Sequence, residues 1–539
     1  MKNNSLIIIL IIAAFSLLIN VGNYGLIESS DARYAEISRA MYVSGDYLHP
    51  NLMEVHHYHK PPFTYQITAL GYRIFGINAF AARFFLQVAV LLQIILVYYL
   101  ALSVFNNKTT AVWSALIYFS FPIVLISSRN LTTDAFLNTF ALLSMLAWVK
   151  YRKSGKYSYL YLFTLSWALG FLTKGPVIFI VPLFFIIGYN RVEKAKNSFS
   201  FHHIVAWLIF IGVAASWFIY LAVDNPAFID YFLGKQTIDR FADKSAFHRT
   251  EPFWYFLAFA PLVGLPWLLF FPFMIKNQKE LFTKRTIYRV LLLAVLIPLV
   301  FFSISSSKRI LYILPLYSIL ALLIAQLLYL SGEKYGKIYT NFNLAYAFLI
   351  LGAFILAPFI KTGMLFSKVL APEASVLLLA AILLYRKKLL PVKSKAVYLS
   401  FIVGVFLLVA SSKVMSDNEL KVNGSKPITE FLIKENLNKR NILIYNTRKP
   451  SIAFGLNKPV VSLYDGSYDL NRETQFEKDL NWKKYLINLK NENELLYLKK
   501  LQDKPTVLLL YKQKLPKSRK WIAEHYPNKK EMGKWVIYY

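Results

Sequence analysis

Apolar runs of about twenty residues recur along the chain up to about residue 415, separated by short polar loops. The first, Ser5 to about Ile27, is long enough to cross ~30 Å of hydrocarbon. No convincing cleavage site follows it, so we interpret it as a signal anchor with a cytoplasmic N-terminus. With the later runs it predicts about 13 transmembrane helices. The later runs lie at 77–105, 110–127, 131–149, 157–173, 175–190, 203–223, 253–275, 287–304, 309–330, 343–361, 374–386 and 396–414.

Lysine and arginine concentrate in every second loop. The basic loops lie at residues 150–156, 191–196, 276–289, 334–337 and 386–395. The positive-inside rule places these loops in the cytoplasm. An odd number of spans then places everything after Lys413 outside. We therefore expect a multi-pass protein of the bacterial cytoplasmic (inner) membrane, with its active face and C-terminal domain extracytoplasmic.

The pattern changes at about Ser416, where short strand-like segments begin to alternate with polar helical stretches. This is typical of a small α/β domain. The predicted strands are 441–445, 460–464, 506–511 and 535–539, and the predicted helical stretches are 426–438 and 476–501. We expect two domains, a transmembrane domain at 1–415 and an extracytoplasmic α/β domain at 416–539.

Composition agrees with an α-helical polytopic membrane protein. Hydrophobic residues make up 56% and charged residues 17% of the 539 residues, and the mean hydropathy is +0.44. Cysteine is absent, which excludes disulfides and cysteine nucleophiles. The formal net charge is +32, and we expect membrane-borne anionic partners rather than nucleic acid.

The first outer loop, roughly 28–76, has helical segments of its own. Ser29 or Ser30 can cap a helix over Arg33–Val43, and Asp31 then falls in its first turn. Such a helix would lie in the membrane interface rather than cross the bilayer. The pair Pro61-Pro62 can begin a second helix over Phe63–Phe75. Lys60 would then lie at a helix N-terminus, where backbone N–H groups help to hold a phosphate.

Other outer loops add polar side chains to the same membrane face. They are Asp134, Lys174, Asp239 and Arg240, His248 to Glu251, Lys308 and Arg309, and Tyr312. Taken singly, each has a structural explanation, because an interfacial lysine or arginine can snorkel and a loop aspartate can cap a helix. Five loops on one face favour a binding site.

Six motifs, in order, give the chain a family resemblance: DARYAEISRAM, SGDYLHP, HKPP, LTKGP, PFWYF and SKRILYILP. This order resembles the bacterial lipid A 4-amino-4-deoxy-L-arabinose transferases, which are related to protein O-mannosyltransferases. The resemblance covers about residues 5–320. It implies the integral-membrane glycosyltransferase fold called GT-C, with interfacial helices in the first outer loop. It also implies inverting transfer from a polyprenyl-phosphate sugar to a lipid A-like lipid, a glycan or a protein.

The resemblance assigns roles to individual residues. Ligands of the donor phosphate are Lys60, Arg240 and Tyr312, together with Arg33. The expected substrate-binding residues are Tyr34, Tyr58, Lys174 and Lys308. Asp134 matches the second outer-loop acid of the clan.

The catalytic acid is ambiguous between two carboxylates. The family usually reads Asp-Glu-Ala-Arg-Tyr, whereas this chain reads Ser30-Asp31-Ala32-Arg33-Tyr34. An ungapped alignment therefore places Ser30 at the catalytic acid. We expect Asp31 to take the role, with Glu28 as the alternative.

A divalent metal, Zn²⁺ or Mg²⁺, is a further possibility. His59 stands where the lipid A transferases generally have a glutamate that is associated with a metal site, and Glu54 lies nearby in the chain. The cluster Glu54, His56, His57 and His59 has no regular ligand spacing. Contact of these histidines with headgroups or water is the alternative.

Two other classes of function compete with transfer. A transporter or flippase would handle the same lipid-linked sugar without chemistry, but such proteins place polar residues near the midplane and often show repeat symmetry. Here the polar residues gather at one face and no internal repeat is visible. An assembly or scaffold protein would leave the gathering of polar loops unexplained.

Overall fold

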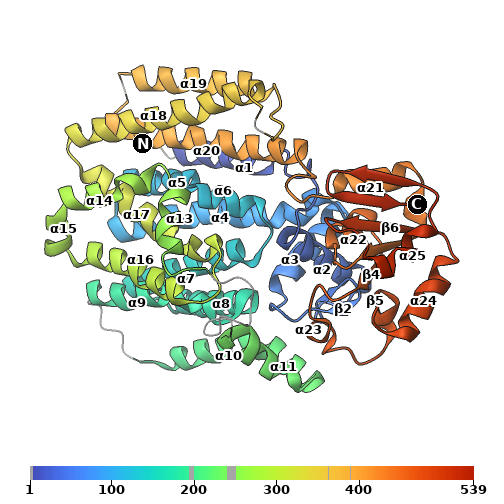
Figure 1. Cartoon of the computed structure of the whole chain (residues 1–539). Helices are drawn as coiled ribbons and strands as arrows, with labels where there is room; N and C mark the ends of the chain where they lie inside the picture. Colours follow the sequence, from blue (N-terminus) through green and yellow to red (C-terminus); the bar gives the residue numbers. More distant parts are fainter. Residues whose placement is uncertain (1–3, 194–198, 240–250, 362, 389) are drawn as a thin grey trace. The chain divides into compact units, whose positions relative to one another are not determined.

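A computed structural model of the chain describes residues 4–193, 199–239, 251–361, 363–388 and 390–539. The chain forms two compact units, which are described separately here (Figure 1). The helical unit comprises Met1–Ile19, His59–Phe63 and Leu86–Ser411. The second unit comprises Asn20–Tyr58, Thr64–Phe85 and Ser412–Tyr539.

The helical unit consists of α-helices joined by short turns. Its main helices are α1 (Asn4–Leu18), α4 (Ala79–Phe105), α5 (Lys108–Ser120), α6 (Pro122–Arg129), α7 (Thr133–Ser154), α8 (Tyr157–Lys174), α9 (Ile180–Val192), α10 (Phe201–Asp224), α13 (Tyr255–Val263), α14 (Trp267–Asn277), α16 (Thr286–Ile304), α17 (Leu314–Leu330), α18 (Glu333–Leu356), α19 (Leu370–Arg386) and α20 (Val392–Asp417). Short pieces complete it: α11 (Ala227–Ile229), α15 (Lys279–Lys284), the 3-10 helices Gly175–Phe179, Ile310–Ile313 and Ala357–Phe359, and the π-helix Asp230–Asp239.

The predicted count of about 13 spans is not confirmed. Among the described residues, seven helices are long and apolar enough to cross a membrane, or up to nine if each of two bent pairs forms one span. The predicted spans 157–173 and 175–190 form one helical run, Tyr157–Val192, because the 3-10 helix continues it between α8 and α9. The first helix ends at Leu18, before the predicted Ile27.

Prolines explain the two bent pairs. The pair α5 and α6 bends by 59° at Phe121, which is extended because the following Pro122 disfavours the helical conformation of its predecessor. The pair α13 and α14 bends by 98° before Trp267, where Pro266 precedes the second helix. The first bend turns the chain toward Arg129 and the loop that begins α7.

Buried polar side chains join the helices inside this unit. The Gln93 side-chain amide donates to the Ala135 carbonyl (2.7 Å) and to Thr139 (2.9 Å). The Tyr118 hydroxyl donates to Gln93 Oε1 and accepts from Asn138 Nδ2. In an apolar surrounding such groups are costly unless paired, so the network fixes how α4, α5 and α7 face one another.

In the second unit, the two helices expected in the first outer loop are confirmed. They are α2 (Ser30–Ser44) and α3 (Phe63–Phe75), and a short antiparallel hairpin lies between them, β1 (Asn51–Leu52) and β2 (Val55–His56). Of the two serines predicted as caps, Ser29 lies at the N-cap position but its side chain accepts no capping hydrogen bond. Instead Asp31 Oδ2 accepts the Ile27 N–H at 3.0 Å.

The C-terminal part forms a six-stranded sheet of order β5-β4-β3-β6-β8-β7. Its strands are β3 (Asn441–Tyr445), β4 (Val461–Tyr464), β5 (Leu486–Asn488), β6 (Thr506–Tyr511), β7 (Lys529–Met532) and β8 (Trp535–Tyr538). Strands β5, β4, β3 and β6 are parallel, and β8 and β7 add antiparallel. All four predicted strands are confirmed.

Two strands and one helix differ from prediction. The stretch 476–501 is helical only toward its end, in α24 (Glu492–Gln502), because apolar Leu486 and Ile487 pair with β4 as strand β5. Strand β7 has a polar sequence at a sheet edge, so no apolar run reveals it.

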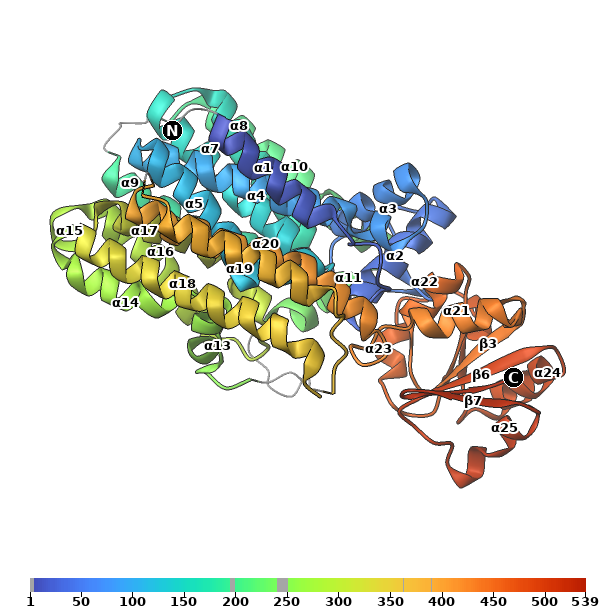
Figure 2. The ribbon, with the colours of Figure 1, turned by 90° about the horizontal axis from the view of Figure 1, so that it is seen from above.

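Figure 2 shows α21 (Lys426–Lys434) and α25 (Trp521–Glu524) on opposite sides of the sheet.

The core of this sheet faces α24 and α25. Leu498 and Ile522 from these helices pack with the alternate residues of the four parallel strands. The strand residues are Leu443, Tyr445, Val461, Leu463, Ile487, Leu508 and Leu510. Strands β3 and β6 are apolar and buried on both faces of the sheet, so short continuous apolar runs are the reason why they could be recognised in the sequence.

Candidate functional site

The predicted site residues divide between the two units. The helical unit contains His59, Lys60, Asp134, Lys174, Lys308 and Tyr312. The second unit contains Glu28, Asp31, Arg33, Tyr34, Glu54 and Tyr58. Arg240 and His248 to Arg249 lie outside the described residues.

In the helical unit, Asp134, Lys174 and Tyr312 come together from three separate loops. Lys174 Nζ lies 2.5 Å from Asp134 Oδ1 and 4.2 Å from the centroid of the Tyr312 ring. The side chains of Asp134 and Lys174 are each only 8% exposed. A charge-assisted bond and a cation–π contact thus hold one buried ammonium between an acid and a phenol.

Local sequence explains how these residues reach one another. Thr132 caps α7 and donates its hydroxyl to Asp134 Oδ2 at 3.0 Å, which fixes the carboxylate in the first turn. Lys174 is the last residue of α8, and Gly175 follows with φ +73° and ψ −151°, a conformation that favours glycine. Tyr312 lies on the 3-10 helix before α17.

Two further cationic segments belong to the helical unit. Lys308 is buried, and its ammonium donates to the backbone carbonyls of Glu251 (2.7 Å) and Ser305 (2.6 Å). The short segment 59–63 carries Lys60, which is half-buried. Next to it the His59 ring lies 6.1 Å from the Tyr231 ring. Lys60 and Lys308 thus bring positive charge to the unit that contains Asp134.

In the second unit, Asp31 is paired with Arg83. Arg83 Nη2 lies 2.5 Å from Asp31 Oδ2, and both side chains are buried. The same guanidinium donates to the carbonyls of Val21 (3.0 Å), Tyr24 (3.1 Å) and Gly25 (2.7 Å). Asp31 therefore stabilises the turn before α2 in addition to any role in chemistry.

Glu28 also has a fixed partner. One of its carboxylate oxygens accepts the Ser451 N–H at 3.0 Å and the Ser451 hydroxyl at 2.6 Å, at the start of α22 (Pro450–Leu456). Burial raises the pKa of Glu28, although nearby Lys449 and the bonds from Ser451 act in the opposite direction. Glu28 thus joins the segment before α2 to the C-terminal α/β region.

The remaining predicted residues of this unit have mixed surroundings. Tyr34 is buried and its ring lies 5.2 Å from the Tyr65 ring. Tyr58 is 3% exposed and packs on Phe476 at 5.0 Å. Arg33 is half-buried. Tyr34 and Tyr58 are thus mostly buried, whereas Arg33 is partly accessible.

The described residues do not fit a metal site. Among them, no group of three or more histidine, aspartate or glutamate side chains is arranged to hold an ion. Burial raises the pKa of Glu54, and neighbouring Glu477 raises it further while Arg39 lowers it.

Sequence reasoning overlooked Arg83. The residue lies inside the apolar run 77–105, and a charged side chain within such a run is a functional or structural site by default. Its partner could not be identified, because Asp31 is far from it in the chain.

The fold defines the class of protein. The structure superposes on that of ArnT from Cupriavidus metallidurans bound to undecaprenyl phosphate with a TM-score of 0.80, over 100% of this chain and 98% of that chain. The apo form of the same protein gives 0.78 over 99% and 97%. Sequence identity is 18% and 17%, so the likeness concerns the fold alone. The predicted GT-C fold of integral-membrane glycosyltransferases is confirmed, and the chain is a multi-pass membrane protein.

Sequence comparisons point to particular relatives. A model of the dolichyl-phosphate-mannose-protein mannosyltransferase family matches residues 59–220. The undecaprenyl phosphate-alpha-4-amino-4-deoxy-L-arabinose arabinosyl transferase of Aeromonas hydrophila is 33% identical over 300 residues, 54% of each chain. The protein of that name from Yersinia pestis is 32% identical over 306 residues, 55% of this chain and 54% of its own. The chain thus matches about half the length of these curated relatives, and the predicted resemblance is confirmed.

The Asp134–Lys174 pair yields a first prediction. Lys174→Met leaves Asp134 buried without its cation and should destabilise the protein by about 3–5 kcal/mol. The double change Asp134→Asn/Lys174→Met should recover much of this loss, because no uncompensated charge remains. Thermal unfolding in detergent measures both.

The matched control for this pair is Lys284→Met. Lys284 pairs with Glu280, and both side chains are 73% exposed, so its removal should leave the unfolding temperature nearly unchanged. Equal losses in Lys174→Met and Lys284→Met would contradict a buried, interacting pair.

The Asp31–Arg83 pair yields a second prediction. Asp31→Asn should lower the unfolding temperature, because it leaves Arg83 buried with carbonyl partners but no carboxylate. Ser30→Ala should change it little. An unchanged unfolding temperature in Asp31→Asn would show that this carboxylate is not needed for the fold.

Proposed function

We propose that the chain is a glycosyltransferase that moves a sugar from a polyprenyl-phosphate donor to a lipid A-like lipid, a glycan or a protein acceptor. The observation that carries this proposal is the cluster Asp134–Lys174–Tyr312, built from three loops in a fold shared with a transferase whose structure contains undecaprenyl phosphate. The names of the relatives agree with a polyprenyl-phosphate donor and favour transfer over transport.

The leaving group determines which side chains are needed. Transfer breaks the bond between the sugar C1 and the phosphate oxygen, and the bonding electrons leave with the polyprenyl phosphate. Negative charge therefore grows on the phosphate. Lys60 and Arg240 would stabilise it, and the Tyr312 hydroxyl would donate a hydrogen bond. Arg33 would add positive charge.

The acceptor provides the electron pair for the new bond to C1. A hydroxyl acceptor must lose a proton, and a carboxylate then takes it as general base. A phosphate acceptor is already ionised and needs only orientation. Inversion at C1 follows from a single displacement, in which acceptor and leaving group lie on opposite sides of the sugar.

Three carboxylates compete for the role of base. Asp31 forms an ion pair with Arg83, and Glu28 accepts a hydrogen bond from Ser451. Both carboxylates therefore stabilise the fold, and replacing either one would disturb it. Asp134 is also paired, with Lys174, but Lys174 faces the ring of Tyr312, so this carboxylate lies beside an expected ligand of the donor phosphate. Asp134 is for this reason our leading candidate among the three, ahead of the sequence-based choice of Asp31.

The donor site yields a third prediction. Lys60→Ala and Arg240→Ala should each remove most activity while the protein still inserts and purifies normally, because each removes a cation that faces the growing charge. The assay supplies purified protein with a polyprenyl-phosphate sugar and measures released polyprenyl phosphate. Near-normal turnover in either variant would refute the assignment of that residue.

The same assay separates the candidate acids. Asp134→Asn and Asp31→Asn should both lose transfer, and both should lower the unfolding temperature, because each leaves a buried cation without its carboxylate. If Glu28→Gln is inactive and the other two variants are active, Glu28 has the role instead.

The sidedness of the protein is the fourth prediction. We propose that residues 416–539 form an extracytoplasmic domain and that the active face lies on the same side. Reporter fusions after Lys156, Lys284 and Lys388 should report cytoplasm, and fusions after Ala242 and at Tyr539 should report the outside. A cytoplasmic result at Ala242 would contradict the site, because Arg240 would then lie on the wrong side of the membrane.

A further inference from the structure

The hairpin β1–β2 lies directly before the Lys60 segment and has an unusual turn. Its two turn residues, Met53 and Glu54, have φ +51° and +65°. A two-residue turn with both residues in the left-handed region normally uses Asn-Gly, because side chains are strained there. The turn sequence itself therefore does not favour this hairpin, and other contacts must hold it.

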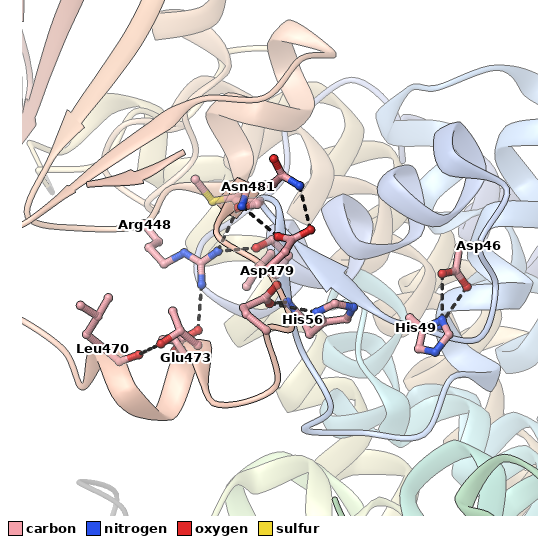
Figure 3. Close-up of polar contacts among 12 residues, drawn as sticks. Asp46, His49, His56, Arg448, Leu470, Glu473, Asp479 and Asn481 are labelled. Carbon is pink, nitrogen blue, oxygen red and sulfur yellow. Dashed lines mark hydrogen bonds and ion pairs between the residues drawn. The ribbon is translucent and has the colours of Figure 1, made fainter. Parts of the chain in front are cut away.

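Arg448 of the C-terminal α/β region supplies one such contact. Its guanidinium donates to the carbonyls of Leu52 and Met53, at the start of the strained turn, and lies 2.7 Å from Glu473 Oε2 (Figure 3). The side chain of Arg448 is 10% exposed. One nitrogen, Nη2, faces both carbonyls, with Met53 at 3.4 Å, while Nη1 faces Glu473, so the guanidinium joins the hairpin turn to residue 473.

Glu477 supplies the second contact, on the other strand. Its Oε1 accepts the His56 N–H at 2.6 Å and lies 2.9 Å from His56 Nδ1. Glu477 is 8% exposed at its side chain. Next to it Phe476 packs on Tyr58, so the hairpin is held at its turn, at its second strand and just beyond.

These contacts differ from those of an ordinary sheet edge. Among the described residues, β1 and β2 pair only with each other, and a two-residue pairing is marginal in water. The hairpin conformation thus depends on side chains from residues 448–477, several hundred positions later in the sequence.

We propose that Arg448 and Glu477 are positioning residues for the donor site, because they hold the hairpin that precedes Lys60. This inference rests on the proposed role of Lys60 as a ligand of the donor phosphate. Lys60 follows His56 by only four positions, and Pro61 and Pro62 stiffen the chain beyond it. Without the contacts from Arg448 and Glu477, the hairpin would be less ordered. Lys60 would then adopt many orientations, and few of them would let its ammonium contact the donor phosphate.

The test is a comparison of steady-state kinetics in the full-length protein. Arg448→Gln and Glu477→Ala should each raise the KM for the polyprenyl-phosphate sugar, by roughly 10- to 100-fold. The KM for the acceptor should stay within about twofold. A purely structural loss would instead reduce the amount of active enzyme and leave both KM values unchanged.

A double-mutant cycle with Lys60→Ala shows whether the effect passes through Lys60. If Arg448 acts by positioning Lys60, adding Arg448→Gln to Lys60→Ala should change the KM for the donor little further. Arg448→Lys should recover part of the loss. An ammonium can keep the contact with Glu473, but it cannot also donate to both hairpin carbonyls. Full additivity of the two changes would overturn the proposal.

Arg519→Gln is the matched control. Arg519 donates to the Leu489 carbonyl at 2.7 Å and lies 3.4 Å from Asp465, all within the C-terminal α/β region. It should leave the KM for the donor unchanged. If Lys60→Ala itself has no effect on the KM for the donor, the role of Lys60 and the positioning both fail. If Lys60→Ala acts and neither Arg448→Gln nor Glu477→Ala does, the positioning alone fails.

Discussion

One buried guanidinium, that of Arg83, determines the shape of the chain where it leaves α1 and enters α2. It donates to three carbonyls of the turn, those of Val21, Tyr24 and Gly25, and pairs with Asp31, so the turn cannot shift without leaving a buried charge unpaired. Gly25 lies in this turn, where an added Cβ would come within 2.8 Å of Lys426. The turn is thus fixed from both sides, and Glu28, Asp31 and Arg33 follow it in positions that depend on it.

The fixed turn around Arg83 also bears on which polar residues take part in catalysis and which stabilise the fold. Asp31 and Glu28 both have partners that a folded protein needs, which limits how freely either can exchange a proton. In the helical unit, Asp134 pairs with Lys174, and Lys174 also faces the Tyr312 ring. An arrangement of acid, ammonium and phenol can orient an anionic donor and keep a carboxylate ionised. The chemistry we propose therefore depends more on α7, α8 and the turn before α17 than on the motif that begins α2.

Much of the fold could be predicted from the sequence, because its signals were local. Pro61-Pro62 marked the start of α3, and short apolar runs marked β3, β4, β6 and β8. The motifs around Lys174 and Tyr312 identified two residues that the structure brings into contact. Signals that depend on distant partners were missed. Neither Arg83 with Asp31 nor Arg448 with the hairpin carbonyls could be inferred, because each pair is far apart in the chain. The number of spans could not be predicted from the hydropathy pattern either, because a 3-10 helix can continue a helical run through a segment that the pattern predicts as a loop.

The central claim is that this chain transfers a sugar, and the fate of the sugar in the cell tests it most directly. Mass spectrometry can compare envelope glycolipids from cells that lack the chain, express it, or express Lys60→Ala. The account predicts that only the wild-type chain adds one sugar residue to an acceptor, with no accumulation of the lipid-linked donor. An unchanged acceptor pool, together with a donor that has only moved across the membrane, would contradict transfer and support a flippase.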